Sequence, residues 1–204
     1  RPKDGKLYAV GLQGNLYTLN PNNGEAIFLR KLIADPSDNT DGNASFTQIM
    51  GDANLITVNF NPAADRLRVI SNTGQNLRIN VDTGATITDG TINLATGSAA
   101  VVAGAYTNAF AGTGSTKLYS IDQNSDRIYL QNANAGTLGN STALGADINT
   151  NGGGGFDIGA VNDVGFAALK LASGNYKFFK LNLANVGTSS DAVFESHDLN
   201  NSFN

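Results

Sequence analysis

Short apolar runs separated by turn residues follow one another along the whole chain. In one segment these runs are Leu55–Phe60, Leu67–Ile70, Leu77–Val81 and Thr86–Thr88, and the residues between them include Gly, Asn, Asp and Pro. Runs of this length, rich in aliphatic and β-branched residues, are typical of strands. The pattern predicts four consecutive antiparallel strands in this segment.

An internal duplication relates this segment to the start of the chain. Arg1–Ile27 aligns without a gap to Asn61–Ile87, and weaker copies of the pattern run through Lys117–Gly136 and Gly165–Leu183. The residues that coincide in the first two copies include Pro2 with Pro62, Leu7 with Leu67, Gly14 with Gly74, and Gly24 with Gly84. Glycines that match at both turns indicate a repeated supersecondary unit.

The length of the repeat distinguishes a β-propeller from the other all-β architectures. Four-stranded antiparallel units that recur about four times are the blades of a β-propeller, whereas a sandwich or a barrel has no repeat as long as a blade. We therefore expect a single all-β propeller domain over residues 1–204, with units at approximately 1–50, 51–98, 99–150 and 151–204.

The first predicted blade is incomplete. In the second unit the strand Leu55–Phe60 precedes Asn61, whereas in the first unit Arg1 already stands where the equivalent strand ends. The inner strand of this blade is then cleaved, unobserved, carried by another molecule or supplied by the tail Asp191–Asn204, which contains the strand-like run Ala192–Phe194. An unpaired strand edge is a template for another chain, so strand addition between molecules is one of these alternatives.

The amino-acid composition and charge argue against several classes of fold and of partner. The chain has 24 Gly, 27 Asn and 15 Asp against 2 Glu, and only 15% of its residues are charged, which argues against a helical protein and against disorder. A net charge of -4 makes nucleic acid an unfavourable partner. No apolar stretch is long enough to span a bilayer, and without Cys there are no disulfides. The Asn- and Gly-rich composition favours an extracellular location.

Three arginines gather in the second unit. Arg66 and Arg68 share one face of a predicted strand, and Arg78, on the next strand, joins that face if the register allows. Together they could hold an anionic ligand. The alternative, which we favour, is a structural role in which they pair with Asp65, Asp82 and neighbouring carbonyl groups.

Calcium is the one cofactor that the sequence suggests. Asp147, Asn149 and Asn151 precede a glycine in the pattern D-x-[DN]-x-[DN]-G, which opens an oxygen-ligand loop. The closing acid is absent from its usual place. Two further candidates are Asp122–Asp126, which also fits a hairpin turn, and the acidic loop Asp35–Asn43.

No catalytic constellation is evident in the sequence. The one histidine, His197, is near the C-terminal end, and no nucleophile-elbow motif occurs. The aspartates stand mostly in turn contexts such as Asp82–Gly84 and Asp89–Gly90, where they bond to their own backbone. We predict no catalytic residues.

A distinctive motif links the chain to a known family. Asn59–Val69 and Gly74–Asn80 together read N-F-N-P-A-A-D-R-L-R-V and G-Q-N-L-R-I-N, and further matches include Ala105–Asn108 and Gly155–Ile158. These segments resemble a bacterial domain-of-unknown-function family found mostly in exported proteins. The resemblance covers nearly the whole chain and implies a propeller-like fold and an exported protein, with no established activity.

Two functional hypotheses follow. The first is a non-enzymatic extracellular propeller for adhesion or self-assembly, with a second copy or an extracellular surface as its partner. The second is a ligand-binding or enzymatic propeller that uses a polar cluster in its central channel, such as Arg66, Arg68 and Arg78.

Overall fold

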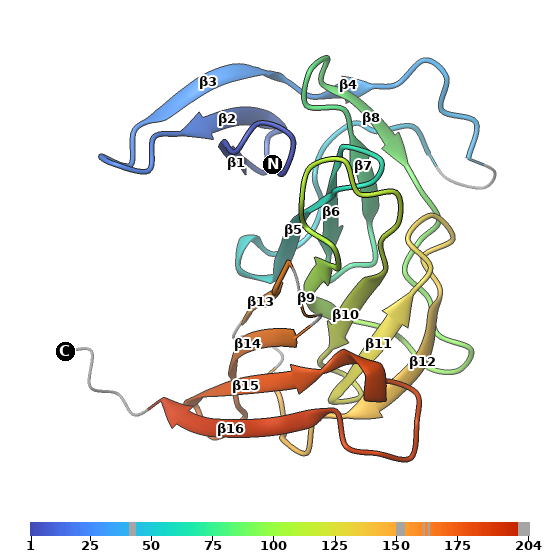
Figure 1. The fold of residues 1–204 in the computed structure, drawn as a ribbon. Helices are drawn as coiled ribbons and strands as arrows, with labels where there is room; N and C mark the ends of the chain where they lie inside the picture. The colour runs from blue at the N-terminus through green and yellow to red at the C-terminus, as the bar shows by residue number, and fades with distance from the viewer. Residues whose placement is uncertain (41–43, 150–153, 161, 163, 200–204) are drawn as a thin grey trace.

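A computed structural model of the chain describes residues 1–40, 44–149, 154–160, 162 and 164–199. In this part of the chain, β-strands are accompanied by only two short 3₁₀ turns, Ala53–Leu55 and Leu183–Asn185. The strands form four sheets that are arranged as the blades of a four-bladed β-propeller (Figure 1). No described helix is long and apolar enough to cross a membrane.

Each blade is a meander of consecutive antiparallel strands. Blade 1 has three strands, in the order β1-β2-β3, and blades 2, 3 and 4 each have four that follow the chain outward from β5, β9 and β13. The strands of blades 1 and 2 are β1 (Leu7–Val10), β2 (Asn15–Leu19), β3 (Ala26–Lys31), β5 (Ile56–Asn61), β6 (Arg66–Ser71), β7 (Asn76–Ile79) and β8 (Ala85–Thr88). Those of blades 3 and 4 are β9 (Val101–Tyr106), β10 (Leu118–Asp122), β11 (Arg127–Gln131), β12 (Leu138–Ala143), β13 (Gly154–Ile158), β14 (Val164–Lys170), β15 (Tyr176–Asn182) and β16 (Val193–Leu199).

The blades fan out in an arc. The first strands of blades 2, 3 and 4 lie next to one another, with β9 in contact with both β5 and β13, and blades 1 and 4 stand at the two ends (Figure 1). Among the described residues, no strand of blade 1 pairs with a strand of blade 4. Each end blade therefore packs one face against a neighbour and leaves the other face uncovered.

The four strands predicted in the second unit are confirmed to within a few residues by β5, β6, β7 and β8. The three-stranded blade 1 matches the expectation that this blade lacks its innermost strand. The tail does not complete it. Val193–Leu199 pairs with β15 as the outer strand of blade 4, because the chain turns back at Leu183–Asn185 beside its own blade. Residues 200–204 lie outside the described part.

An additional short strand joins the first two blades. Strand β4 (Ile33–Ala34) follows blade 1 in the chain but pairs in parallel with β8 of blade 2, through bonds from the Ile33 N–H to the Gly84 carbonyl and from the Asp35 N–H to the Thr86 carbonyl. Gly84 has a φ of +81°, and a Cβ there would lie 2.7 Å from the Lys31 carbonyl oxygen. Only glycine allows this close approach of the two chains.

Apolar residues fill the spaces between neighbouring blades. Leu16 of blade 1 packs with Leu67 and Leu77 of blade 2. A second cluster joins blades 2 and 3, and a third joins blade 3 to the inner-facing residues of blade 4. Burial of these faces is the main favourable term that holds the blades side by side.

Candidate functional site

The contact between blades 2 and 3 contains a buried arginine. Arg68, on β6, is 2% exposed, and its Nη1 donates to Asp89 Oδ2 at 2.6 Å and to Asn76 Oδ1 at 2.9 Å. Its Nε donates to the Tyr106 hydroxyl at 3.1 Å, and its Nη2 donates to Asn134 Oδ1 at 3.3 Å. Two of these partners belong to blade 3, so the guanidinium group ties the blades together.

Arg78 completes this cluster from the next strand. It stands directly opposite Arg68 in the register of β6 and β7, and its Nη2 donates to Asp89 Oδ1 at 2.9 Å. Asp89, 2% exposed, therefore neutralises two facing arginines. Arg66 lies apart and donates to the carbonyl groups of Ala64 and Asp65.

Asp65 and Asp82, the expected partners of the three arginines of the second unit, instead accept hydrogen bonds from Arg1. The Arg1 guanidinium donates to both carboxylates at distances of 2.5–2.7 Å, and its side chain is only 4% exposed. Because Arg1 precedes blade 1 while both aspartates are in turns of blade 2, this cluster joins the first two blades. The hydrogen bond from Arg1 is the main cause that lowers the pKa of Asp65 to about 2, and it also lowers the pKa of Asp82.

The space between the innermost strands has a different character. A cavity of about 240 Å³ is lined there by uncharged residues of β5, β9 and β13. These are Ile56, Thr57, Val58, Ala103, Gly104, Gly154, Gly155 and Phe156. The three arginines of the second unit are on β6 and β7, and none of them lines this cavity.

The first calcium candidate is only partly described. Asp147 and Asn149 precede blade 4, where the Asn149 N–H donates to the Lys170 carbonyl, and Asn151 lies outside the described residues. Asp147 shares a polar cavity of about 620 Å³ with Asp126, from the second candidate loop. Within the described part of the chain, no group of three or more His, Asp or Glu side chains is placed to hold a metal.

The other candidate residues occupy turns and an outer strand. Asp122 is fully buried at the end of β10, where it accepts hydrogen bonds from the backbone N–H groups of Ala100 and Ser125. Asp35 and Asp38 accept from nearby backbone N–H groups, and Asp41 is outside the described residues. His197 is exposed on β16, with its Nε2 2.6 Å from Glu195 Oε1. This contact lowers the pKa of Glu195.

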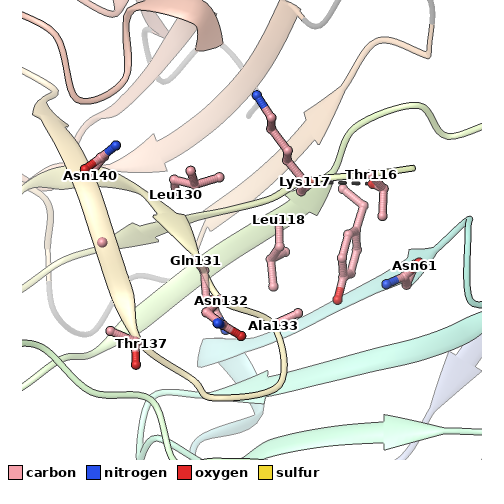
Figure 2. Close-up of a pocket in the computed structure, with 12 residues that line it drawn as sticks. Asn61, Thr116, Lys117, Leu118, Leu130, Gln131, Asn132, Ala133, Thr137 and Asn140 are labelled. Carbon is pink, nitrogen blue, oxygen red and sulfur yellow. Dashed lines mark hydrogen bonds between the residues drawn. The ribbon is translucent and has the colours of Figure 1, made fainter. Parts of the chain in front are cut away.

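Another cavity, of about 570 Å³, opens beside blade 3 (Figure 2). Its polar lining includes Asn61, Lys117, Gln131, Asn132 and Asn140. Apolar surface comes from Leu118, Leu130, Ala133 and the ring-bearing Tyr106. Cavities of this size, with apolar walls and a few polar groups, are typical of small-molecule sites.

Sequence reasoning missed the residues that organise both sites. Asp89 was interpreted as a turn residue, and nothing in its spacing connects it with Arg68. The cavity is assembled from the ends of β5, β9, β10, β11 and β12. The amide-rich composition was a general signal for such a site, but it pointed to no particular Asn or Gln.

A family comparison covers nearly the whole chain. The model of a domain of unknown function, DUF4394, matches residues 1–200. The chain belongs to the DUF4394 family. This confirms the expectation of an uncharacterised domain family, and it assigns no activity to the DUF4394 chain. No curated protein is similar enough in sequence to count as a relative.

Solved structures resemble this DUF4394 domain in fold. A chain of a nidogen–laminin complex matches with a TM-score of 0.53 at 14% identity, over 95% of this chain and 60% of that chain. A protein of unknown function from Bacteroides caccae matches with a TM-score of 0.49, over 96% and 73%. An auxiliary nutrient binding protein from Bacteroides thetaiotaomicron matches with 0.43, over 80% and 42%. The last two are also 14% identical. The first likeness supports the fold alone, and the DUF4394 chain spans about 60% of that structure.

Proposed function

We propose that this DUF4394 domain is a non-enzymatic extracellular module that self-associates, with the free face of blade 1 packed against the free face of blade 4 in a second copy. The observation that carries the proposal is the uncovered face at each end of the arc, where large apolar side chains such as Phe28 and Phe166 are exposed. The extracellular location rests on the Asn- and Gly-rich composition and on the family resemblance.

The free face of blade 1 carries mostly apolar side chains, with Asn15 and Lys31 paired at one end of it. The register pairs Leu7 with Leu19, Ala9 with Tyr17, and Tyr17 with Phe28, so these five side chains lie on one side of the sheet. Leu16, on the other side, is fully buried against blade 2. Leu7 is 50% exposed and Phe28 is 56% exposed, although the Phe28 ring contacts Tyr17 edge to face.

The free face of blade 4 carries aromatic side chains together with two lysines. Phe166 pairs with Lys180, Ala168 with Phe178 and Lys170 with Tyr176, which places all six side chains on the same side of the sheet. The rings of Phe166 and Phe178 stack with their centroids 6.1 Å apart. Phe166 is 40% exposed, whereas the alternating residues on the other side are buried.

A second copy is the occupant that fits both faces. Every interface within the arc contains apolar side chains packed between two sheets, and a blade 1 face on a blade 4 face would continue this packing. Large exposed apolar patches mark interaction surfaces. The contact joins two different surfaces, so it is head-to-tail and builds a closed ring or an open chain of copies.

The described lining of the cavity between the innermost strands contains no ionisable side chain, which supports a non-enzymatic role. Catalysis commonly uses titratable side chains placed in a pocket. The described lining of the central cavity offers none, and the nearby arginines are engaged by Asp89.

The test measures molar mass by light scattering over a wide concentration range. We expect the mass to rise with concentration, and to stay at the monomer value for Phe28→Asp and for Phe166→Asp. The matched control is Phe110→Asp, because Phe110 is 48% exposed in a loop outside both faces. An equimolar mixture of the first two variants should form a 1:1 complex and nothing larger, because each retains one intact face. A wild-type chain that stays monomeric throughout contradicts the proposal.

A further inference from the structure

The cavity of Figure 2 is lined by amide side chains. Most of them use their oxygen atom in a hydrogen bond within the protein, and their NH₂ group remains as a donor. Among the four amide side chains that line it, three use their carbonyl oxygen within the protein. The NH₂ group of an amide supplies two donors, and a lysine ammonium supplies three. The chemistry of this cavity is therefore decided by which polar atoms remain free.

Two asparagines have a fixed orientation. Asn61 Oδ1 accepts from the backbone N–H groups of Ala63 at 3.1 Å and Ala64 at 2.9 Å, and Asn132 Oδ1 accepts from the Ala135 N–H at 3.1 Å. A backbone N–H can only donate, so the atom that faces it must be the amide oxygen. Each NH₂ group is then left for a ligand.

Gln131 and Lys117 add further donors. Gln131 is 4% exposed, its Oε1 is 2.5 Å from the Ser120 hydroxyl, and its buried Nε2 has no acceptor among the described groups. A buried donor without a partner is costly unless water or a ligand satisfies it. Lys117 lies exposed at the rim and forms no ion pair with any described residue. The described residues that line the cavity include no aspartate or glutamate.

We propose that this cavity binds an acidic sugar, a hexuronic acid unit whose carboxylate and hydroxyl oxygens accept from Asn61, Gln131, Asn132 and Lys117. A lining with one cation and no acid favours a negatively charged ligand. Hydrogen bonds from these donors to a carboxylate are stronger than bonds to a neutral oxygen. Leu118, Leu130 and Ala133 provide the apolar surface against which the carbon face of a sugar ring can lie. This inference does not depend on self-association.

The experiment compares two sugars that differ only in the carboxylate. Calorimetric titration of the chain with D-galacturonate and with D-galactose should show binding of the acid that is about tenfold tighter or more. Acetate should bind far more weakly than D-galacturonate, because it lacks the ring hydroxyls. Equal affinity for the two sugars, no binding of either, or acetate that binds as tightly as D-galacturonate overturns the proposal.

The variants replace a donor by an acceptor without removing the turn. Asn132→Asp and Asn61→Asp keep the oxygen that accepts from the backbone, but each places a carboxylate in the cavity. Each should weaken D-galacturonate binding about tenfold or more, with the thermal midpoint unchanged. The matched control is Asn20→Asp, because Asn20 Oδ1 accepts from the Asn22 N–H in a similar turn of blade 1, which does not line the cavity. Undiminished binding by both cavity variants overturns the proposal.

Discussion

Two arginine–aspartate clusters join neighbouring blades, and they differ in their access to water. Between blades 2 and 3, Asp89 and Arg68 are 3% and 2% exposed at the side chain. Between blades 1 and 2, the carboxylates of Asp65 and Asp82 are 23% and 58% exposed around a largely covered Arg1. The same ion-pair chemistry therefore acts in a buried and in a partly hydrated setting. The comparison indicates that the first cluster is needed for the fold, whereas the second adjusts stability with pH and salt.

The largest effect is expected from removing the buried carboxylate. Asp89→Asn leaves Arg68 and Arg78 facing each other without a counter-ion. Breaking a buried ion pair on one side costs about 3–5 kcal/mol. The free energy of unfolding, measured with urea, should fall by this amount.

The control for this prediction makes the same chemical change in the other cluster. Asp82→Asn should lower the free energy of unfolding by less than about 1 kcal/mol, because exposed ion pairs contribute little. Equal losses for the two variants would show that burial does not distinguish the clusters.

A smaller effect is expected from acid at the hydrated cluster. The pKa of Asp65 is about 2 in the folded chain against an ordinary 3.8, because Arg1 hydrogen-bonds its ionised form. A lowered folded-state pKa adds stability that is present above about pH 4 and is lost as the pH falls towards about 2. The loss should be about 1–2 kcal/mol, since water partly screens the pair.

This pH dependence is measured by urea unfolding at several pH values, for the wild type and for Asp65→Asn. The variant should be less stable than the wild type at neutral pH, and the difference should shrink as the pH falls. A difference that is constant with pH would rule out the Arg1 hydrogen bond as its source.

The smallest effect is expected at the polar cavity of about 620 Å³, whose described lining contains no arginine. Asp126 and Asp147 share this cavity, and the proposed calcium ligands are Asp147, Asn149 and Asn151. A ligand that prefers the native state raises stability by mass action. Calcium should therefore raise the thermal midpoint by a small amount, and Asp147→Asn should abolish the rise. If calcium gives no binding heat and no change in the thermal midpoint, the prediction of a calcium site is wrong.

The regularity of the strands explains how much of the fold was predictable. Apolar runs bounded by Gly, Asn and Pro identified β5 to β8, and the duplication of Arg1–Ile27 identified a blade without its first strand. The pairing of β4 with β8 escaped prediction, because two residues carry no detectable period. The position of Val193–Leu199 in blade 4 depends on a chain reversal that the apolar pattern does not specify.

The sites were harder to predict because their partners are distant in the chain. The register of Arg68 and Arg78 follows from strand spacing, but their shared partner Asp89 directly follows β8 and is brought to them by the pairing of β8 with β7. The free donors of Asn61 and Asn132 depend on which side of each amide the turn uses. The local backbone determines the orientation of each amide, and the number of asparagines in the sequence does not reveal it.

The short strand β4 also constrains the order of folding. Its partner β8 is formed by Ala85–Thr88, about fifty residues further along the chain, so its two hydrogen bonds cannot form before that part of blade 2 is in place. The segment that leaves blade 1 is thus fixed only after its neighbour has been built. We expect blade 2 to form first and to act as the surface on which blade 1 assembles.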